Sequence, residues 1–349
     1  MPPSLLYAKA GLLLTRGRRG SLEVEELQKD LRRLAYLRTG IDGDFGKSTE
    51  QAVRALQHDL LRNEGKGSDG NAPVRVIDYN RSRVVDVDGV VTAGLAGCIR
   101  DMLEDENFPK VPSSPNPKEE NRKALGTLAH LADLEVPIQF LLAILRQESG
   151  LKHFCEPTRR NHDSFVVVGL DTNASEKHVV TSRGYGIGQF TIFHHPPTGD
   201  EVEDFVVDSR KNVTKAEAEL KDKFALFVNG STSGTRADDR FAEAGGGPLR
   251  VCKHSPSDPR FLHDCRNCLL QAGSQTIRAG QTPFYRGSAH TYQPTRYHPA
   301  EVYEDVPLRQ NIPCDWPYAV RRYNGSGVNS YHYQAKVLLA ARDIQLETV

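Results

Sequence analysis

The sequence predicts a mainly α-helical protein with a small three-helix domain and a larger α-rich domain that contains a long irregular insertion. Apolar residues recur at helical spacing in several segments. A proline-rich stretch separates two groups of these segments. Many Gly, Pro, Asp and Ser residues then interrupt the second group between Gln189 and Tyr323. A chain of 349 residues is long enough for both domains.

The first domain is expected over residues 20–104. Its first helix is indicated by apolar residues at helical spacing: Val24, Leu27, Leu31 and Leu34. A tight Asp-Gly turn follows, because Gly accepts positive φ and Asp can bond to its own backbone. A second helix carries Ala52, Val53, Leu56 and Leu60, and a second Asp-Gly turn precedes a third helix with Leu95, Ile99 and Leu103.

Two connecting segments complete this part of the chain. Residues 62–87 form an insertion in which Val74, Val76 and Ile77, followed by Val84 and Val85, predict a short hairpin. Residues 105–117 are expected to be a linker, because their prolines favour extended backbone. The second domain then runs over residues 118–349, and its first helix should carry Leu125, Leu128, Ala129 and Leu131.

The most informative residue is Glu148, in a predicted helix that begins at Pro137 and stops at Gly150. This glutamate continues an apolar stripe formed by Leu141, Ile144 and Leu145. A carboxyl group in apolar surroundings keeps its proton to higher pH, which suits a general acid. On the helix alone, the alternative is a solvated glutamate that follows a buried helix.

Three motifs occur downstream in a recognisable order. The first is Gly184-Tyr185-Gly186-Ile187-Gly188-Gln189, the second is Tyr323-Asn324-Gly325, and the third is Tyr333, four residues before Val337. Together with Glu148-Ser149, this order resembles the lytic transglycosylases and goose-type lysozymes. The resemblance covers about the C-terminal two thirds of the chain, in separated blocks.

The resemblance implies cleavage of the bond between N-acetylmuramic acid and N-acetylglucosamine. Glu148 would protonate the bridging oxygen and then deprotonate the muramyl C6 hydroxyl, which attacks C1 and leaves a 1,6-anhydro ring. Intramolecular attack gains from proximity. Gln189 and Tyr333 would complete the catalytic set, and no cofactor would be required. The substrate-binding residues would be Ser149, Tyr185, Gly186, Gly188, Tyr323 and Asn324.

Each of these assignments has a plainer alternative. Gln189 would then only stabilise its turn, and the tyrosines would be core residues with satisfied hydroxyl groups. Hydrolysis is the alternative reaction, since goose-type lysozymes carry Asp residues near the Gly-Gln turn. Thr191 stands where that group places one, and Asp163 or Asp171 would have to substitute.

The first domain resembles the three-helix peptidoglycan-binding domain, through Leu27-Gln28, the turn over 42–49 and Asp88-Gly89. The partner implied by both resemblances is the peptidoglycan glycan strand. Lys plus Arg and Asp plus Glu both count 45, which argues against a nucleic-acid partner. No apolar run approaches a membrane span.

The six cysteines are Cys98, Cys155, Cys252, Cys265, Cys268 and Cys314. Cys252, Cys265 and Cys268 with His263 (and His254 nearby) are candidate ligands of a structural zinc ion. A disulfide with Cys155 or Cys314 is the competing interpretation, and free thiols are the third.

We expect synthesis in the cytoplasm without a signal peptide, because residues 1–4 carry no early positive charge and Lys9 interrupts the only short apolar stretch. Action in the periplasm or cell wall would then require lysis-type release or injection. This suits a phage endolysin or an antibacterial effector, and an effector would have a cognate immunity protein.

The rival classes of function are a non-catalytic wall-binding component of a virion or secretion apparatus, and a metal-dependent activity of the Cys/His insertion.

Overall fold

A computed structural model describes residues 5–9, 11–38, 40–130, 135–228, 250–278, 293–299, 302–325 and 327–345. The prediction of a mainly helical protein with an N-terminal helical domain is confirmed. The chain forms two compact units. The first unit comprises Met1–Ala124 and Lys152–Asn212, and the second comprises Leu125–Leu151 and Val213–Val349. These units do not coincide with a division at residue 118, because residues 152–212 group with the N-terminal part.

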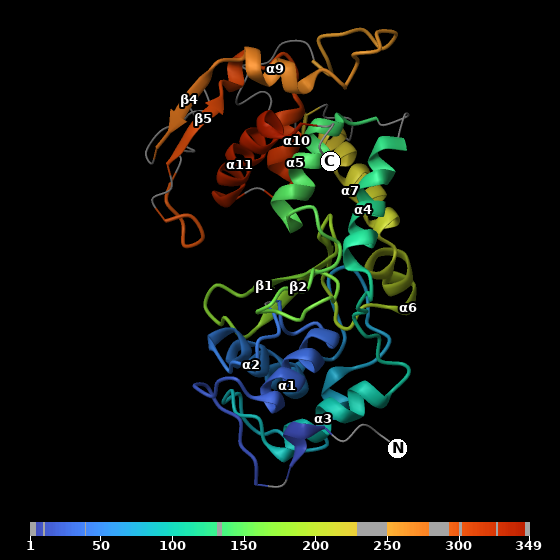
Figure 1. Ribbon diagram of the computed structural model, residues 1–349, viewed down its shortest axis with the longest axis vertical. Coiled ribbons are helices and arrows are strands. Elements are labelled where there is room, and N and C mark those ends of the chain that lie inside the picture. The colour runs from blue at the N-terminus through green and yellow to red at the C-terminus, as the bar shows by residue number, and fades with distance from the viewer. Residues whose placement is uncertain are drawn as a thin grey trace. The chain divides into compact units, whose positions relative to one another are not determined.

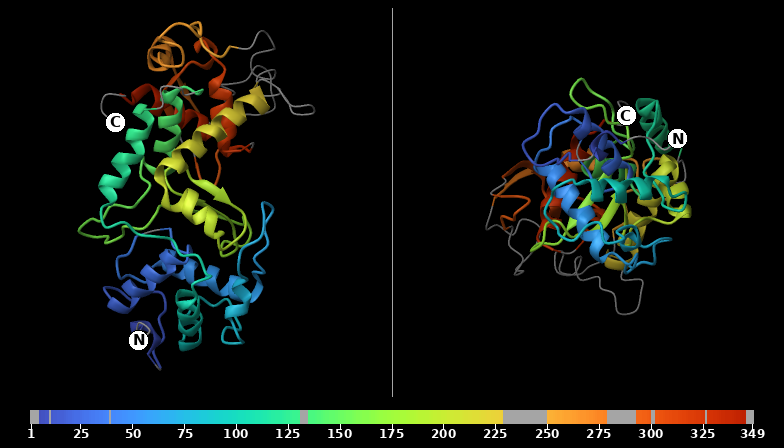
Figure 2. Two further views of the ribbon diagram at one scale, coloured as in Figure 1. Left: turned by 90° about the vertical axis from the view of Figure 1, so that its right-hand side faces the viewer. Right: turned by 90° about the horizontal axis from the view of Figure 1, so that it is seen from below.

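Three helices form the N-terminal part of the first unit, as expected: α1 (Leu22–Arg33), α2 (Lys47–Arg62) and α3 (Ala93–Glu104). Ser21 caps α1 by accepting a hydrogen bond from the N–H of Val24, and Thr92 caps α3 in the same way. The helices share one apolar core, to which the short 3-10 helix η1 (Leu6–Ala8) contributes Tyr7. The helices α1, α2 and α3 lie next to one another in both views of Figure 2, where they are coloured blue to cyan.

The two Asp-Gly turns of this domain are held by equivalent glutamines. Gln28 Oε1 accepts from the N–H groups of Asp42 (3.0 Å) and Gly43 (2.9 Å). Gln57 Oε1 accepts from the N–H of Gly89 (2.8 Å), while its Nε2 donates to Oδ1 of Asp88 (2.6 Å). Each turn is therefore fixed to the helix before it by one amide side chain.

One expectation for this region is wrong. Residues 62–87 contain no hairpin of strands; instead the 3-10 helix η2 (Val76–Tyr79) buries Val76 in the core. The segment 105–117, expected to be a linker, is attached to this domain: Phe108 is buried in the same core, and the N–H of Val111 bonds to the carbonyl of Arg33 at 2.7 Å.

An antiparallel sheet in the order β1-β2-β3 completes the first unit, with strands β1 (Val168–Thr172), β2 (Val180–Tyr185) and β3 (Phe190–Ile192). It is followed by α6 (Gly199–Glu201) and the π-helical segment η3 (Val202–Val207). Arg183 on β2 joins the sheet to the N-terminal helices through Asp59 Oδ2 (3.2 Å) and the carbonyl of Ala35 (3.0 Å). This buried ion pair is one of the contacts that join residues 152–212 to the N-terminal helices.

The second unit is built around α5 (Ile138–Ser149), α10 (Trp316–Tyr323) and α11 (Asn329–Asp343), which lie side by side (Figure 1). Gln334 on α11 donates to the carbonyl of Pro317 (2.7 Å), and Gln139 on α5 donates to that of Ile344 (2.8 Å). Two further helices, α4 (Pro117–His130) and α7 (Ser209–Lys223), each begin in the first unit and end in the second. Leu131, expected on α4, lies outside the described residues.

The described residues of the insertion include several regular elements. After the π-helical segment η4 (Phe224–Val228), it contains α9 (Cys265–Gln271) and strand β4 (Ser274–Ile277), which pairs antiparallel with β5 (Tyr303–Pro307). The 3-10 helix η5 (Arg309–Asn311) then leads to α10. Within the described part of the chain, no helix is both long and apolar enough to span a membrane.

Candidate functional site

The helix that carries Glu148 is shaped by local signals at both ends. Pro137 precedes the helix instead of opening it, and its carbonyl accepts from the N–H of Leu141 (3.1 Å). At the other end Gly150 adopts φ +67°, and Leu151 N–H returns to the carbonyl of Leu145 (3.3 Å). The stripe of Leu141, Ile144 and Leu145 is fully buried, and Glu148 itself is half-buried.

Glu148 meets Tyr333 on the neighbouring helix α11. The hydroxyl of Tyr333 donates a 2.6 Å hydrogen bond to Oε1 of Glu148. Burial raises the pKa of Tyr333 well above its usual value, and the negative charge of Glu148 raises it further. The phenol therefore keeps its proton and acts as a fixed donor to the carboxyl group. The expected closeness of these two residues is found, while the catalytic role of Tyr333 stays a prediction.

Tyr323, the last residue of α10, is the second tyrosine of this site. Burial raises the pKa of Tyr323 well above its usual value, and the charges of Glu148 and Glu219 add to the effect. Glu219 on α7 pairs with Lys223 at 2.7 Å. Glu219 was not predictable from the sequence, because it lies among many charged residues of a helix and belongs to no motif.

The remaining predicted residues of the second unit lie at helix ends. The hydroxyl of Ser149 donates to the carbonyl of Leu145 at 3.0 Å, which ties it to its own helix. Asn324 follows α10 and is exposed, so its amide is free of the core. The predicted contact of Ser149 and Asn324 with a sugar stays a prediction.

Gln189 lies in the first unit, in the turn between β2 and β3. It adopts φ +52°, and its Nε2 donates to the carbonyl of Gly186 at 2.7 Å. Its Oε1 lies over the β1–β2 pair, since a Cβ added at Gly169 would lie 2.2 Å from that atom. The side chain thus stabilises its own turn, and a catalytic role for Gln189 stays a prediction.

Tyr185 is fully buried in the core beside the sheet, and its predicted contact with a substrate stays a prediction. The glycines of the turn accommodate protein side chains. A Cβ added at Gly186, which has φ +73°, would lie 2.5 Å from Cε1 of His153. The N–H of Gly188 donates to Oδ1 of Asn212 at 2.7 Å. His153 and Asn212 are distant in sequence from the turn, so no local pattern indicated them.

The two aspartates considered for water activation also lie in the first unit. Asp163 is buried and forms a 2.9 Å ion pair with Arg32, so it serves the core and is closed to solvent. Asp171 on β1 is exposed and accepts from the hydroxyl of Ser182 at 3.0 Å. Asp163 is therefore unsuited to orient a water molecule.

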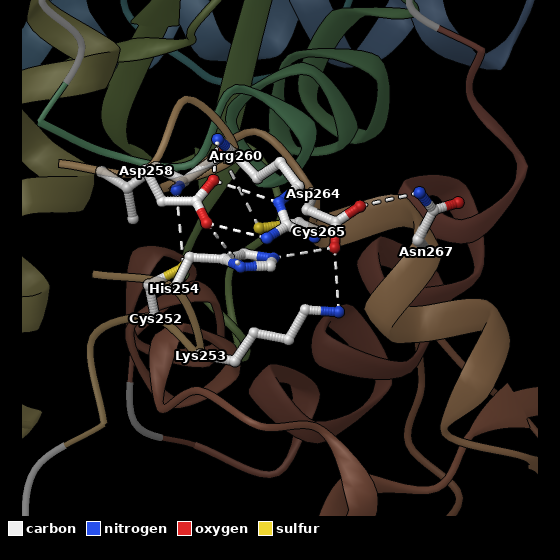
Figure 3. A network of polar contacts seen from close by, with 9 residues as sticks. Cys252, Lys253, His254, Asp258, Arg260, Asp264, Cys265 and Asn267 are labelled. Atoms are coloured by element: carbon white, nitrogen blue, oxygen red, sulfur yellow. Dashed lines mark hydrogen bonds and ion pairs between the residues drawn. The ribbon is translucent and has the colours of Figure 1, made fainter. Parts of the chain in front are cut away.

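A structural zinc ion held by Cys252, Cys265, Cys268 and His263 stays a prediction. Across the described ranges, no three His, Cys, Asp or Glu side chains are arranged to hold a metal ion. His263 is exposed, whereas the nearby His254 is engaged by Oδ2 of Asp264 at 2.9 Å (Figure 3).

The comparison with known families bears on the first domain. Residues 20–60 match the family model described as "Putative peptidoglycan binding domain". No curated protein and no solved structure matches the chain. The matched residues span α1, the first Asp-Gly turn and most of α2. The match supports a peptidoglycan-associated protein whose N-terminal helical domain interacts with peptidoglycan.

Proposed function

We propose that this protein is a peptidoglycan-degrading enzyme that cleaves the β-1,4 bond between N-acetylmuramic acid and N-acetylglucosamine. Glu148 is the general acid and then the general base. The observation that carries the proposal is the hydrogen bond from Tyr333 to Oε1 of Glu148, at the end of a buried apolar stripe. The match of residues 20–60 supports the choice of peptidoglycan as the substrate.

The geometry suggests how the carboxyl group would work. Because Tyr333 occupies Oε1, the acidic proton is directed to Oε2, from which it passes to the glycosidic oxygen as the C1–O bond breaks. The Tyr333 hydroxyl then stabilises the carboxylate that remains. This carboxylate takes the proton of the muramyl C6 hydroxyl while the oxygen of that hydroxyl bonds to C1, which leaves the 1,6-anhydro ring.

The burial of Asp163 in an ion pair favours this reaction over hydrolysis, since it removes one of the two aspartates considered for activating water. Every proton in the scheme passes through Glu148, so the scheme needs no metal or cofactor. The N-terminal domain would hold the enzyme on the wall and raise the local concentration of glycan strands. The site of action would be the periplasm or cell wall, after release by lysis or by injection.

The test is Glu148→Gln in the full chain, with Glu304→Gln as the matched control because Glu304 is an exposed carboxylate of β5 in the same unit. We expect the first variant to lose clearing of purified cell walls while it still binds them, and the control to behave as wild type. Unchanged clearing by Glu148→Gln would remove the assignment.

Mass spectrometry of the released fragments distinguishes the two reactions. Anhydro ends are lighter by one water than hydrolysed ends, so predominantly hydrolysed ends would show that the enzyme is a muramidase. A wild-type protein that binds walls and releases no fragments would instead be a non-catalytic wall-binding component.

A further inference from the structure

Four of the six cysteines come together in the second unit, from three separate segments. Arg250 and Asp315 join the segments 250–252 and 314–316. The N–H of Arg250 donates to Oδ2 of Asp315, the N–H of Asp315 donates to the carbonyl of Arg250, and the two side chains form a 2.8 Å ion pair. The indole of Trp316 also donates to the carbonyl of Val251 at 3.0 Å. These contacts bring the chain at Cys252 next to the chain at Cys314.

The third segment reaches the same place through Leu262. Its N–H donates to Sγ of Cys252 at 3.5 Å, and its carbonyl accepts from the thiol of Cys265 at 3.7 Å. Cys268 follows one turn later on α9, where burial raises the pKa of its thiol and the charge of Lys253 offsets part of that rise.

The thiol of Cys265 is also within electrostatic range of the other three. Burial is the main reason that its pKa is raised far above the usual value, and the charges of Cys314, Cys268 and Cys252 follow in that order. All six cysteines of the chain are free thiols in this structure.

A polar network holds the loop between Cys252 and Cys265 in place (Figure 3). The carboxylate of Asp264 accepts from Lys253 (2.8 Å), His254 (2.9 Å) and Asn267 (2.7 Å). The thiols are therefore positioned by ordinary protein contacts. Three of them, Cys265, Cys268 and Cys314, are at most 9% exposed, whereas Cys252 is only partly buried.

We propose that these four thiols form two disulfides, Cys265–Cys314 and Cys252–Cys268, when the protein enters an oxidising compartment. Each bond forms by thiol–disulfide exchange with a small-molecule or protein disulfide. Two thiols lose two protons and two electrons, and the oxidant is reduced to two thiols. Of the four thiols, Cys252 alone is not buried, so exchange should begin there.

The structural consequence concerns the second unit. The Cys265–Cys314 bond would join α9 to the residue just before α10, the helix that ends at Tyr323. It would thus fix the insertion to the helix that carries part of the candidate site. The proposal is independent of the reaction assigned to Glu148, because its chemistry and its test concern thiols alone.

The experiment uses the full chain, purified with a reductant and then equilibrated with glutathione disulfide. Alkylation and intact-mass measurement should count six free thiols before oxidation and two afterwards, those of Cys98 and Cys155. Peptide mapping without reduction should join the peptides of Cys265 and Cys314, and those of Cys252 and Cys268. Four thiols that stay free, or other pairings, would overturn the proposal.

Variants give a second readout. Cys265→Ser and Cys314→Ser should each abolish the same cross-linked peptide and lower the melting temperature of the oxidised protein by about 5 °C or more. Cys98→Ser, in the first unit, should leave the pairing unchanged. Elemental analysis of the reduced protein is the remaining check: a stoichiometric metal that protects the four thiols from oxidation would also overturn the proposal.

Discussion

Tyr333 and Glu148 lie 185 positions apart in the sequence, and a 2.6 Å hydrogen bond joins the phenol of one to the carboxyl group of the other. The two side chains project from adjacent helices, α11 and α5. Because the pKa of Tyr333 is raised by burial and by Glu148 itself, the phenol stays a donor throughout the accessible pH range. A carboxyl group with one oxygen fixed in this way presents its other oxygen in a defined direction.

Tyr333→Phe should lower the rate of wall clearing by about 10-fold to 100-fold, because the carboxyl group loses the donor that orients it. The ring and its packing remain, so we expect little change in the melting temperature. Initial rates at saturating wall concentration, with wall binding measured in parallel, check this prediction. An unchanged rate would show that the hydrogen bond has no part in the reaction.

Asp59 should stabilise the first unit through its ion pair with Arg183. Burial alone would raise the pKa of Asp59, but hydrogen bonding from His58 and the charge of Arg183 outweigh it and lower the pKa to about 2. Because the pKa of Asp59 is lower in the folded state than in the unfolded state, where it is near 3.8, ionised Asp59 stabilises the folded state above pH 3.8. This stabilisation is lost as the pH falls to about 2. The shift corresponds to about 2 kcal/mol.

Asp59→Asn should therefore cost about 3–5 kcal/mol at pH 7, since it leaves the buried guanidinium of Arg183 without its counter-charge. It should also flatten the fall in stability between pH 4 and pH 2. Urea unfolding across this range, with the exposed Asp78→Asn as control, is the measurement. A variant as stable as the control would mean that the ion pair contributes nothing.

Asp30 should have the opposite pH dependence. Burial raises its pKa to about 6, although the hydroxyl of Tyr7 donates to it at 2.6 Å and partly compensates. With the folded pKa above the unfolded value of 3.8, the unfolded state ionises first, so stability falls as pH rises from 4 to 6. The total loss is about 3 kcal/mol.

Asp30→Asn keeps an acceptor for Tyr7 and removes the buried charge. We expect it to be more stable than wild type at pH 7 by about 1–3 kcal/mol, with a flat profile between pH 4 and pH 6. Unfolding curves at four pH values within this window are sufficient. A less stable variant at pH 7 would indicate that the attraction to Arg33 outweighs the cost of burial.

Gly186→Ala should destabilise the turn after β2 by about 1–3 kcal/mol, because the residue has positive φ and the new methyl group would overlap His153. Gly199→Ala is the matched control, since nothing lies within 4 Å of a Cβ at that position. Chemical denaturation of both variants measures the difference. Equal stability would show that His153 moves aside freely.

Features that depend on neighbouring residues were predictable. The helical periodicity of α1, α2 and α5, the closing glycine Gly150 and the Asp-Gly turns all follow from backbone preferences over a few residues. The sheet of residues 168–192 was not foreseen, because its short strands are mixed in polarity and are defined by what they pack against.

The sequence by itself determined that helices form at α1, α2 and α5 and placed Glu148 at the end of a buried stripe, since both depend on the spacing of side chains along one helix. Only the tertiary structure decided which groups meet: Tyr333 with Glu148, Arg183 with Asp59, and Asp163 with Arg32. Such pairs join residues more than 120 positions apart, and their energies depend on shared burial, which no local pattern of residues records.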